Sequence, residues 1–134
     1  MRIMLDTNVL ISAIVFKSKT MHEMLAMILN EHRLVLSSYV IDELKQVVSR
    51  KFEGKSSALD EFLIALPYEF VYTPDVMGKE LFKIRDDMDY PVLYTAIIED
   101  VDILVTGDKD FAEVKVKKPE IITPAEFLTK YSAS

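Results

Sequence analysis

The hydrophobic and polar positions of the chain repeat with two alternating periods, which predicts strands and helices in turn. Short runs that are apolar throughout are typical of buried strands, and apolar residues three or four positions apart are typical of amphipathic helices. The runs predict five strands, over residues 2–5, 34–36, 69–72, 103–105 and 120–122. The helical stripes predict helices over 7–16 and 77–84, and others that begin near 20, 38, 57, 89 and 123.

Several polar residues predict where these helices begin and end. Thr20 with Glu23 has the spacing of a capping box, and the segment TPAE at 123–126 has the same spacing. Ser38 is placed to cap the helix that follows the second strand. Pro67 cannot continue a helix, so we expect the helix that begins near 57 to end before it.

Strands that are apolar on both faces and alternate with helices predict an α/β protein with a buried sheet. We therefore expect a three-layer α/β/α sandwich around a five-stranded, mostly parallel sheet. The chain has 134 residues, which is the length of one ordinary domain, so a single domain over 1–134 is predicted.

Composition and charge exclude several classes of function. The chain has no cysteine, which rules out disulfides, thiolate zinc sites and cysteine nucleophiles. Sixteen Lys and Arg against 22 Asp and Glu give a net charge of −6, which argues against coating nucleic acid by bulk charge. It does not argue against an enzyme that meets phosphates through metal ions. The three glycines lie far apart, so no dinucleotide fingerprint, P-loop or nucleophile elbow is present.

The sequence contains no pattern typical of a membrane span or a signal peptide. The apolar stretch over 7–16 is ten residues, whereas a spanning helix needs roughly 20. We therefore expect a cytoplasmic protein that does not enter a membrane.

Three acids fall at element boundaries. Asp6 ends the first strand, Asp108 follows the fourth, and Asp89 begins a helix. The carboxyl ends of parallel strands meet at one edge of a sheet, where ligands gather near the switch point in strand order. Each acid also has a purely structural interpretation, because Asp6 and Asp89 could cap helices and Asp108 could be a turn residue.

Glu43 is the acid that a structural role explains least well. At about 100° per residue it shares a side of its helix with Val40 and Val47, so it lies at the edge of the apolar stripe. A half-buried carboxylate needs a partner. A divalent cation shared with the other acids supplies one, since Mg²⁺ and Mn²⁺ prefer carboxylate oxygens. Two such ions about 4 Å apart can activate a water and stabilise the leaving oxygen in phosphodiester cleavage.

Three segments in order resemble a PIN domain. They are Met4–Ala13 (MLDTNVLISA), Arg85–Leu93 (RDDMDYPVL) followed by Ala96, and Val105–Phe111 (VTGDKDF). The chain is more closely similar to the VapC-like toxin branch of toxin–antitoxin systems, and the resemblance covers nearly its whole length.

The resemblance implies a metal-dependent ribonuclease on a sheet of order 3-2-1-4-5. Asp6, Glu43, Asp89 and Asp108 match the four family acids that hold Mg²⁺ or Mn²⁺ and form the catalytic site. The expected activity is endonucleolytic cleavage of single-stranded RNA, in which an activated water attacks the scissile phosphate.

Other positions match the family pattern less closely. Asp87 and Met88 stand where relatives often carry Pro and a polar residue, so Asp86 is an alternative to Asp89. Asp110 is a candidate accessory ligand. Thr106 matches a hydroxyl near the metal, and Asn8 matches an Asn that braces the turn.

The resemblance also implies partners. A toxin of this branch is expected to act on RNA, to form a homodimer and to be masked by an antitoxin protein. Lys17, Lys19 and Lys109 are candidates for contacting the RNA backbone. The methionines of the second helix (Met21, Met24 and Met27) either join a partner surface or pack in the core, and core packing is the simpler interpretation.

Two other functions compete with this one. A receiver-type signalling module also has an acidic Mg²⁺ pocket, but it needs an Asp at the end of the third strand and a Lys at the end of the fifth. Here the third strand runs into Thr73 and Pro74, and the fifth ends at Thr123. The second alternative is a PIN scaffold that binds a partner without cleaving RNA.

Overall fold

A computed structural model describes residues 1–78 and 81–132 of the chain. All strand pairs in the sheet are parallel, and the strand order is β3-β2-β1-β4-β5. This confirms the predicted fold class and strand order. A receiver domain has the order 2-1-3-4-5, so the receiver alternative is wrong. The strands are β1 (Arg2–Leu5), β2 (Arg33–Ser37), β3 (Glu69–Val71), β4 (Ile103–Val105) and β5 (Glu120–Ile122).

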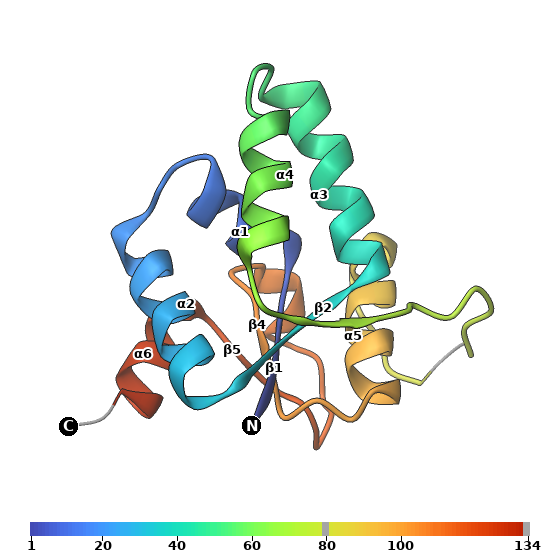
Figure 1. The fold of residues 1–134 in the computed structure, drawn as a ribbon. Coiled ribbons are helices and arrows are strands. Elements are labelled where there is room, and N and C mark those ends of the chain that lie inside the picture. The colour runs from blue at the N-terminus through green and yellow to red at the C-terminus, as the bar shows by residue number, and fades with distance from the viewer. Residues whose placement is uncertain (79–80, 133–134) are drawn as a thin grey trace.

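Helices cover both faces of this sheet. Parallel strands are joined by right-handed crossovers. The crossovers from β1 to β2 and from β2 to β3 run in one direction, and the crossover from β3 to β4 runs back past β1. Figure 1 accordingly shows α5 on one side of the sheet, and α2 packed beside α6 on the other. The helices are α1 (Thr7–Ile14), α2 (Lys19–Glu31), α3 (Ser38–Lys51), α4 (Ser56–Ala65), α5 (Tyr90–Ile98) and α6 (Pro124–Tyr131), with short 3₁₀ turns η1 (Asp87–Asp89) and η2 (Lys109–Phe111).

The central strands lie in the core because both of their faces are covered. Ile3, Met4 and Leu5 of β1 have no exposed surface, and the side chains of β4 are as fully buried. A rigid pair of central strands therefore carries the residues that follow them at the carboxyl edge of the sheet.

Two predicted helix starts are wrong by one or two residues. Helix α2 begins at Lys19 because Ser18, not Thr20, caps it by accepting the Met21 N–H at 3.3 Å. Helix α3 is capped by Ser37, which accepts the Val40 N–H at 3.2 Å. The Ser38 hydroxyl instead accepts the Thr73 N–H at 2.9 Å and so ties α3 to the end of β3. The capping box of α6, between Thr123 and Glu126, is confirmed.

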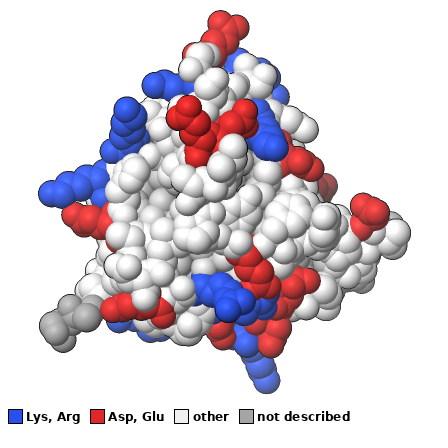
Figure 2. Space-filling view, in the orientation of Figure 1, with Lys and Arg blue, Asp and Glu red and all other residues white. Residues whose placement is uncertain are grey.

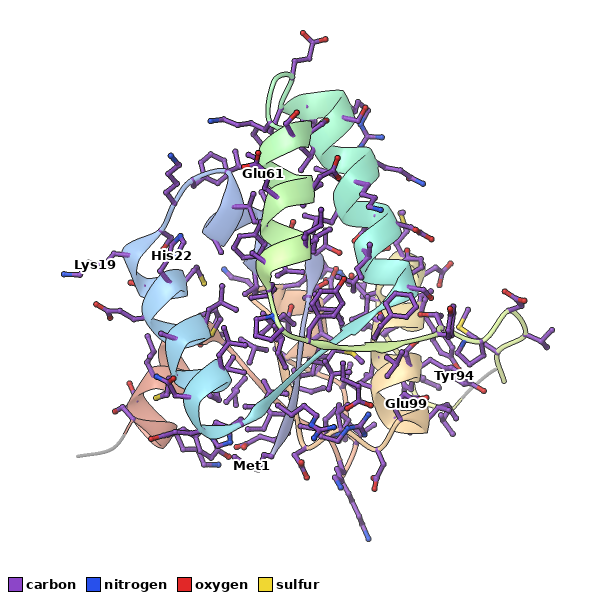
Figure 3. All side chains as sticks on the ribbon, in the orientation of Figure 1. Met1, Lys19, His22, Glu61, Tyr94 and Glu99 are labelled. Carbon is purple, nitrogen blue, oxygen red and sulfur yellow. The ribbon has the colours of Figure 1, made fainter. Side chains whose placement is uncertain are left out.

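The helix predicted over 77–84 is wrong for the residues that the structure describes there. Lys79 and Glu80 lie outside the described residues, and the described residues on either side are not helical. Tyrosine hydroxyls of α5 satisfy the backbone instead: Gly78 N–H donates to Tyr94 Oη at 3.0 Å and Leu81 N–H donates to Tyr90 Oη at 3.4 Å. The ring of Phe82 stacks on Tyr90 with centroids 4.4 Å apart. Figure 3 shows Tyr94 reaching from α5 toward this segment.

The face drawn in Figure 2 has a broad uncharged area over α4 and β3. Exposed Ile64 of α4 and Phe70 of β3 contribute apolar side chains to it. Among the described residues, no helix has the length and apolar character that a membrane crossing requires.

Candidate metal centre

The Asp6 carboxylate lies at the carboxyl edge of the sheet, between the two central strands. Asp6 is only 4% exposed. The Thr7 N–H donates to Asp6 Oδ1 at 2.7 Å, and the Thr106 hydroxyl donates to Asp6 Oδ2 at 2.8 Å. Asp6 and Thr106 follow β1 and β4, which are neighbours at the point where the strand order reverses. The sequence therefore places a fixed carboxylate at the switch point, where α/β sheets bind ligands.

Burial and neighbouring charges act against ionisation of this carboxyl group. Burial raises the pKa of Asp6, and the hydrogen bonds from Thr106 and Thr7 lower it in part. The charges of Glu43 and Asp108 raise the pKa of Asp6 further. A bound cation reverses this balance because it favours the ionised carboxylate.

Asp89 and Asp108 form a carboxyl pair. Burial, followed by the charge of Asp108 and a hydrogen bond with it, raises the pKa of Asp89 to about 8. Asp89 is therefore protonated below about pH 8 in the absence of a cation, and a protonated carboxyl group can donate to Asp108. Asp89 Oδ2 is buried and has no hydrogen-bond partner among the described residues. Asp89 makes no capping hydrogen bond to α5, so its structural interpretation as a helix cap is wrong.

Asp108 is held by hydrogen bonds with Thr106 and with the backbone of Asp110. Its N–H donates to Thr106 Oγ1 at 3.1 Å, and its Oδ1 accepts the Asp110 N–H at 2.9 Å. The turn interpretation of Asp108 is therefore correct but incomplete, because the same carboxyl group faces Asp89. A chain of hydrogen bonds runs from Asp108 N–H through the Thr106 hydroxyl to Asp6.

Glu43 reaches the site from the first turns of α3. It is half-buried, and its charge raises the pKa of both Asp6 and Tyr39. No ion pair or hydrogen bond to the Glu43 carboxylate occurs among the described residues, so its assignment as a metal ligand stays a prediction.

Among the described residues, one group of three acids has carboxylate oxygens close enough together to share a metal ion, and it includes Asp89 but not Asp6, Glu43 or Asp108. Asp86, Asp89 and Asp110 each offer a carboxylate oxygen, and these oxygens lie within 4.8 Å of one another. Asp86 Oδ1 already accepts the Met88 N–H at 2.9 Å, and Asp110 Oδ1 pairs with Arg85 Nε at 3.1 Å. Asp89 therefore belongs to this group and also interacts with Asp108, and Asp110 of the group pairs with the exposed Arg85.

The sequence matches the model of the PIN domain family over residues 2–110. This chain belongs to the PIN domain family. The family predicted from the three sequence segments is therefore confirmed. No curated protein sequence matches the chain significantly.

Three solved structures share the fold of this PIN domain. A chain in the crystal structure of VapBC2 from Rickettsia felis, bound to a DNA fragment from its promoter, is 22% identical with a TM-score of 0.69, over 90% of this chain and 97% of that one. FitAcB from Neisseria gonorrhoeae is 20% identical with a TM-score of 0.64, over 92% and 98%. VapC20 of Mycobacterium tuberculosis, a toxin that cleaves the sarcin–ricin loop, is 14% identical with a TM-score of 0.57, over 82% and 92%.

Tyr39 is a residue of the PIN domain's site that the sequence analysis missed. Its hydroxyl donates to the Met88 carbonyl at 3.0 Å, directly before Asp89 in the chain. Burial raises the pKa of Tyr39, and the charges of Glu43, Asp89, Asp86 and Asp6 raise it further. The available signal was its spacing, because Tyr39 precedes Glu43 by four residues and so lies on the same side of α3.

The remaining sequence candidates divide between the site and the rest of the PIN domain. Lys109 follows Asp108 directly and is exposed. Lys19 points outward from α2 and pairs with Glu23 at 4.0 Å (Figure 3). Met24 is fully buried, and Met21 and Met27 pack against the core, which favours their structural interpretation.

Proposed function

We propose that this PIN domain, over residues 1–134, is an Mg²⁺- or Mn²⁺-dependent endoribonuclease that cleaves single-stranded RNA. The observation that supports it best is Asp89, which has one buried oxygen without a hydrogen-bond partner among the described residues and a pKa raised by burial and by the charges of Asp108 and Asp6. Carboxylates that repel one another in the folded chain are the ligands that a divalent cation stabilises.

The donor set fits such an ion. All candidate ligands are carboxylate oxygens, which are hard donors that suit Mg²⁺ and Mn²⁺, and the chain has no cysteine to favour a softer metal. Asp6, Glu43, Asp89 and Asp108 are the proposed ligands and catalytic residues, with Asp86 and Asp110 as outer members. When bound, the ion supplies charge stabilisation at the scissile phosphate and lowers the pKa of an attacking water.

The protein's own residues orient these ligands. The Thr106 hydroxyl holds Asp6 Oδ2, the Thr7 N–H holds Asp6 Oδ1, and the Asp110 N–H holds Asp108 Oδ1. Each donor fixes the orientation of a proposed ligand, as the groups that hydrogen-bond to ligands do in metal sites. Lys109, next to Asp108, is placed to contact a phosphate.

A toxin role is the second part of the proposal. We infer that the protein is the toxin of a toxin–antitoxin pair, cytoplasmic, inhibited by an antitoxin and active as a homodimer. The similar folds of VapBC2 and of the toxin VapC20 support this role. The uncharged area over α4 and β3 supports burial against a protein partner, since such exposed apolar areas often mark interfaces.

Cleavage of defined RNAs by the purified protein tests the proposal. Single-stranded and duplex RNAs are incubated with Mn²⁺, with Mg²⁺ and with EDTA, and Asp89→Asn protein from the same purification is the control for contaminating nuclease. Internal cuts in single strands that need the metal and disappear with Asp89→Asn support an endoribonuclease. Binding of RNA or a partner without any cleavage would instead favour the non-cleaving PIN scaffold.

A further inference from the structure

A groove of about 570 Å³ opens directly beside the proposed metal centre. Thr106 and Asp108 line one end of it, so the groove and the acidic site share residues. The other lining residues come from the edge strand β5, from the start of α6 and from the segment between η2 and β5. Half-buried Val114, Val116 and Ile121 give it an apolar floor.

Three acidic residues line this groove: Asp108, which belongs to the proposed metal centre, and Glu120 and Glu126, which are engaged within the protein. Glu120 forms an ion pair with Lys130 and accepts a hydrogen bond from Tyr131. Glu126 accepts the Thr123 N–H at 3.0 Å in the capping box of α6. Their charges are therefore partly compensated before any ligand arrives.

The lysines of the groove, in contrast, have no ion pair among the described residues. Lys109 and Lys117 both line it and are exposed. Lys117 belongs to the basic run 115–118, in which the other two lysines either form ion pairs or lie outside the groove. Lys118 pairs with Asp100 at 3.2 Å and Asp102 at 3.4 Å, and Lys115 is exposed but does not line the groove.

We propose that this groove binds the nucleotides on one side of the scissile phosphate, with Lys117 and Lys109 contacting backbone phosphates and the apolar floor contacting bases or riboses. The proposal rests on the nuclease function proposed above and adds a path for the substrate. Unpaired lysines attract the polyanionic backbone of RNA more strongly than they attract a peptide with few acids. The apolar side chains of the groove can contact unstacked bases, which only a single strand offers. Because Asp108 lines the groove, a strand bound there also reaches the proposed metal ligands.

The test compares Lys117→Gln with Lys115→Gln, which removes the same charge from the same exposed run outside the groove. Both variants and wild type cleave single-stranded RNAs of fixed cut site, extended stepwise on the 5′ side or on the 3′ side. In wild type, extension on one side lowers KM until the groove is filled. Lys117→Gln raises KM, with kcat nearly unchanged, and loses most of that length dependence, whereas Lys115→Gln retains it.

Salt dependence gives an independent measurement. Each phosphate contact to a single strand contributes about 0.7 to the slope of log affinity against log salt concentration. Lys117→Gln therefore lowers the slope by about 0.7 relative to Lys115→Gln. If both variants behave alike while metal-dependent cleavage is intact, the groove assignment is overturned and the nuclease function stands. If wild type cleaves no RNA with Mn²⁺ or Mg²⁺, the proposed function fails and the groove assignment fails with it.

Discussion

The Thr106 hydroxyl donates a hydrogen bond of 2.8 Å to Oδ2 of Asp6, which lies a hundred residues earlier in the chain. Thr106 also accepts the Asp108 N–H, so one side chain joins the ends of β1 and β4 to two proposed metal ligands. It is 3% exposed, and its position therefore depends little on solvent. This relationship leads to the first prediction.

Thr106→Val keeps the shape of the side chain but removes both hydrogen bonds. We expect a loss of about 1–3 kcal/mol in the free energy of unfolding, since a buried carboxylate oxygen and an N–H lose their partner. RNA cleavage and metal affinity fall as well, because Asp6 is no longer oriented. Denaturant unfolding and cleavage rates check this, and Thr106→Ser, which retains the hydroxyl, remains close to wild type in both.

Asp89→Asn raises the melting temperature of the metal-free protein at pH 8.5 and removes most of its response to divalent ions. The side-chain amide that the substitution introduces can donate to Asp108 at any pH, whereas Asp89 can do so only while it is protonated. The charge repulsion between the two carboxylates therefore disappears. In wild type, Mn²⁺ at 100 times its dissociation constant adds about 2.7 kcal/mol to the stability of the folded state by mass action. Asp6→Asn is less suitable, since both Asp6 oxygens already accept hydrogen bonds.

Thermal melting with and without Mn²⁺, at matched ionic strength, measures this effect. Asp87→Asn is the control, because Asp87 is exposed on the same 3₁₀ turn. A simple destabilisation by Asp89→Asn, with an unchanged metal response, would contradict a metal role for Asp89.

The stability of the metal-free protein falls as the pH rises from about 4 to about 8. The pKa of Asp89 is raised to about 8 in the folded state, whereas its ordinary value is 3.8. Between these values the folded state holds a proton that the unfolded chain releases, so the free energy of unfolding decreases with pH and levels off above 8. Urea unfolding in EDTA from pH 6 to 9 checks the slope. For Asp89→Asn, the free energy of unfolding changes less with pH. A dependence on pH as steep as that of wild type would contradict the raised pKa of Asp89.

The strand pattern could be predicted closely from the sequence because each strand is a short apolar run bounded by a polar residue. The strands over 2–5, 103–105 and 120–122 have the predicted limits, and Asp6, Thr106 and Thr123 follow them directly. Local patterns fix such boundaries, since the apolar run must be buried and the polar residue marks where the sheet ends.

Helix starts and the 77–84 segment could not be predicted as well, because they depend on competing or distant partners. Both Ser37 and Ser38 can cap α3, and only the distant Thr73 N–H, which occupies the Ser38 hydroxyl, decides between them. In the same way, the hydroxyls of Tyr90 and Tyr94 satisfy a segment whose apolar spacing alone favours a helix.

The candidate site was predictable as a set of acids but not as a geometry. The family resemblance and strand ends indicated Asp6 and Asp108, whereas the orientation of Asp89 toward Asp108 depends on how η1 packs. Tyr39, which donates to the Met88 carbonyl, matched no expected motif, and its spacing of four residues from Glu43 was the one signal for it in the sequence.

Tyr39→Phe removes the hydrogen bond to the Met88 carbonyl and leaves the ring in place. We expect about 1 kcal/mol less stability and weaker binding of Mn²⁺, since the turn that carries Asp89 loses one of its attachments. Titration of the melting temperature with Mn²⁺ gives the affinity. Tyr72→Phe, on an exposed side chain, is the matched control, and equal Mn²⁺ affinities in the two variants would show that Tyr39 does not position Asp89.

Glu43→Gln abolishes RNA cleavage, whereas Glu53→Gln, the same chemical change in the exposed turn that follows α3, leaves it unchanged. Glu43 is half-buried, has no cationic partner among the described residues, and lies close enough to Asp6 to raise its pKa. Removing its charge reduces repulsion in the metal-free fold, so Glu43→Gln is at least as stable as wild type and the loss of cleavage is not a loss of folding. Melting temperatures in EDTA and cleavage rates in Mn²⁺ separate the two effects. Equal cleavage by both variants would assign Glu43 to the surface of α3 and leave the three aspartates as the only ligands among the four proposed acids.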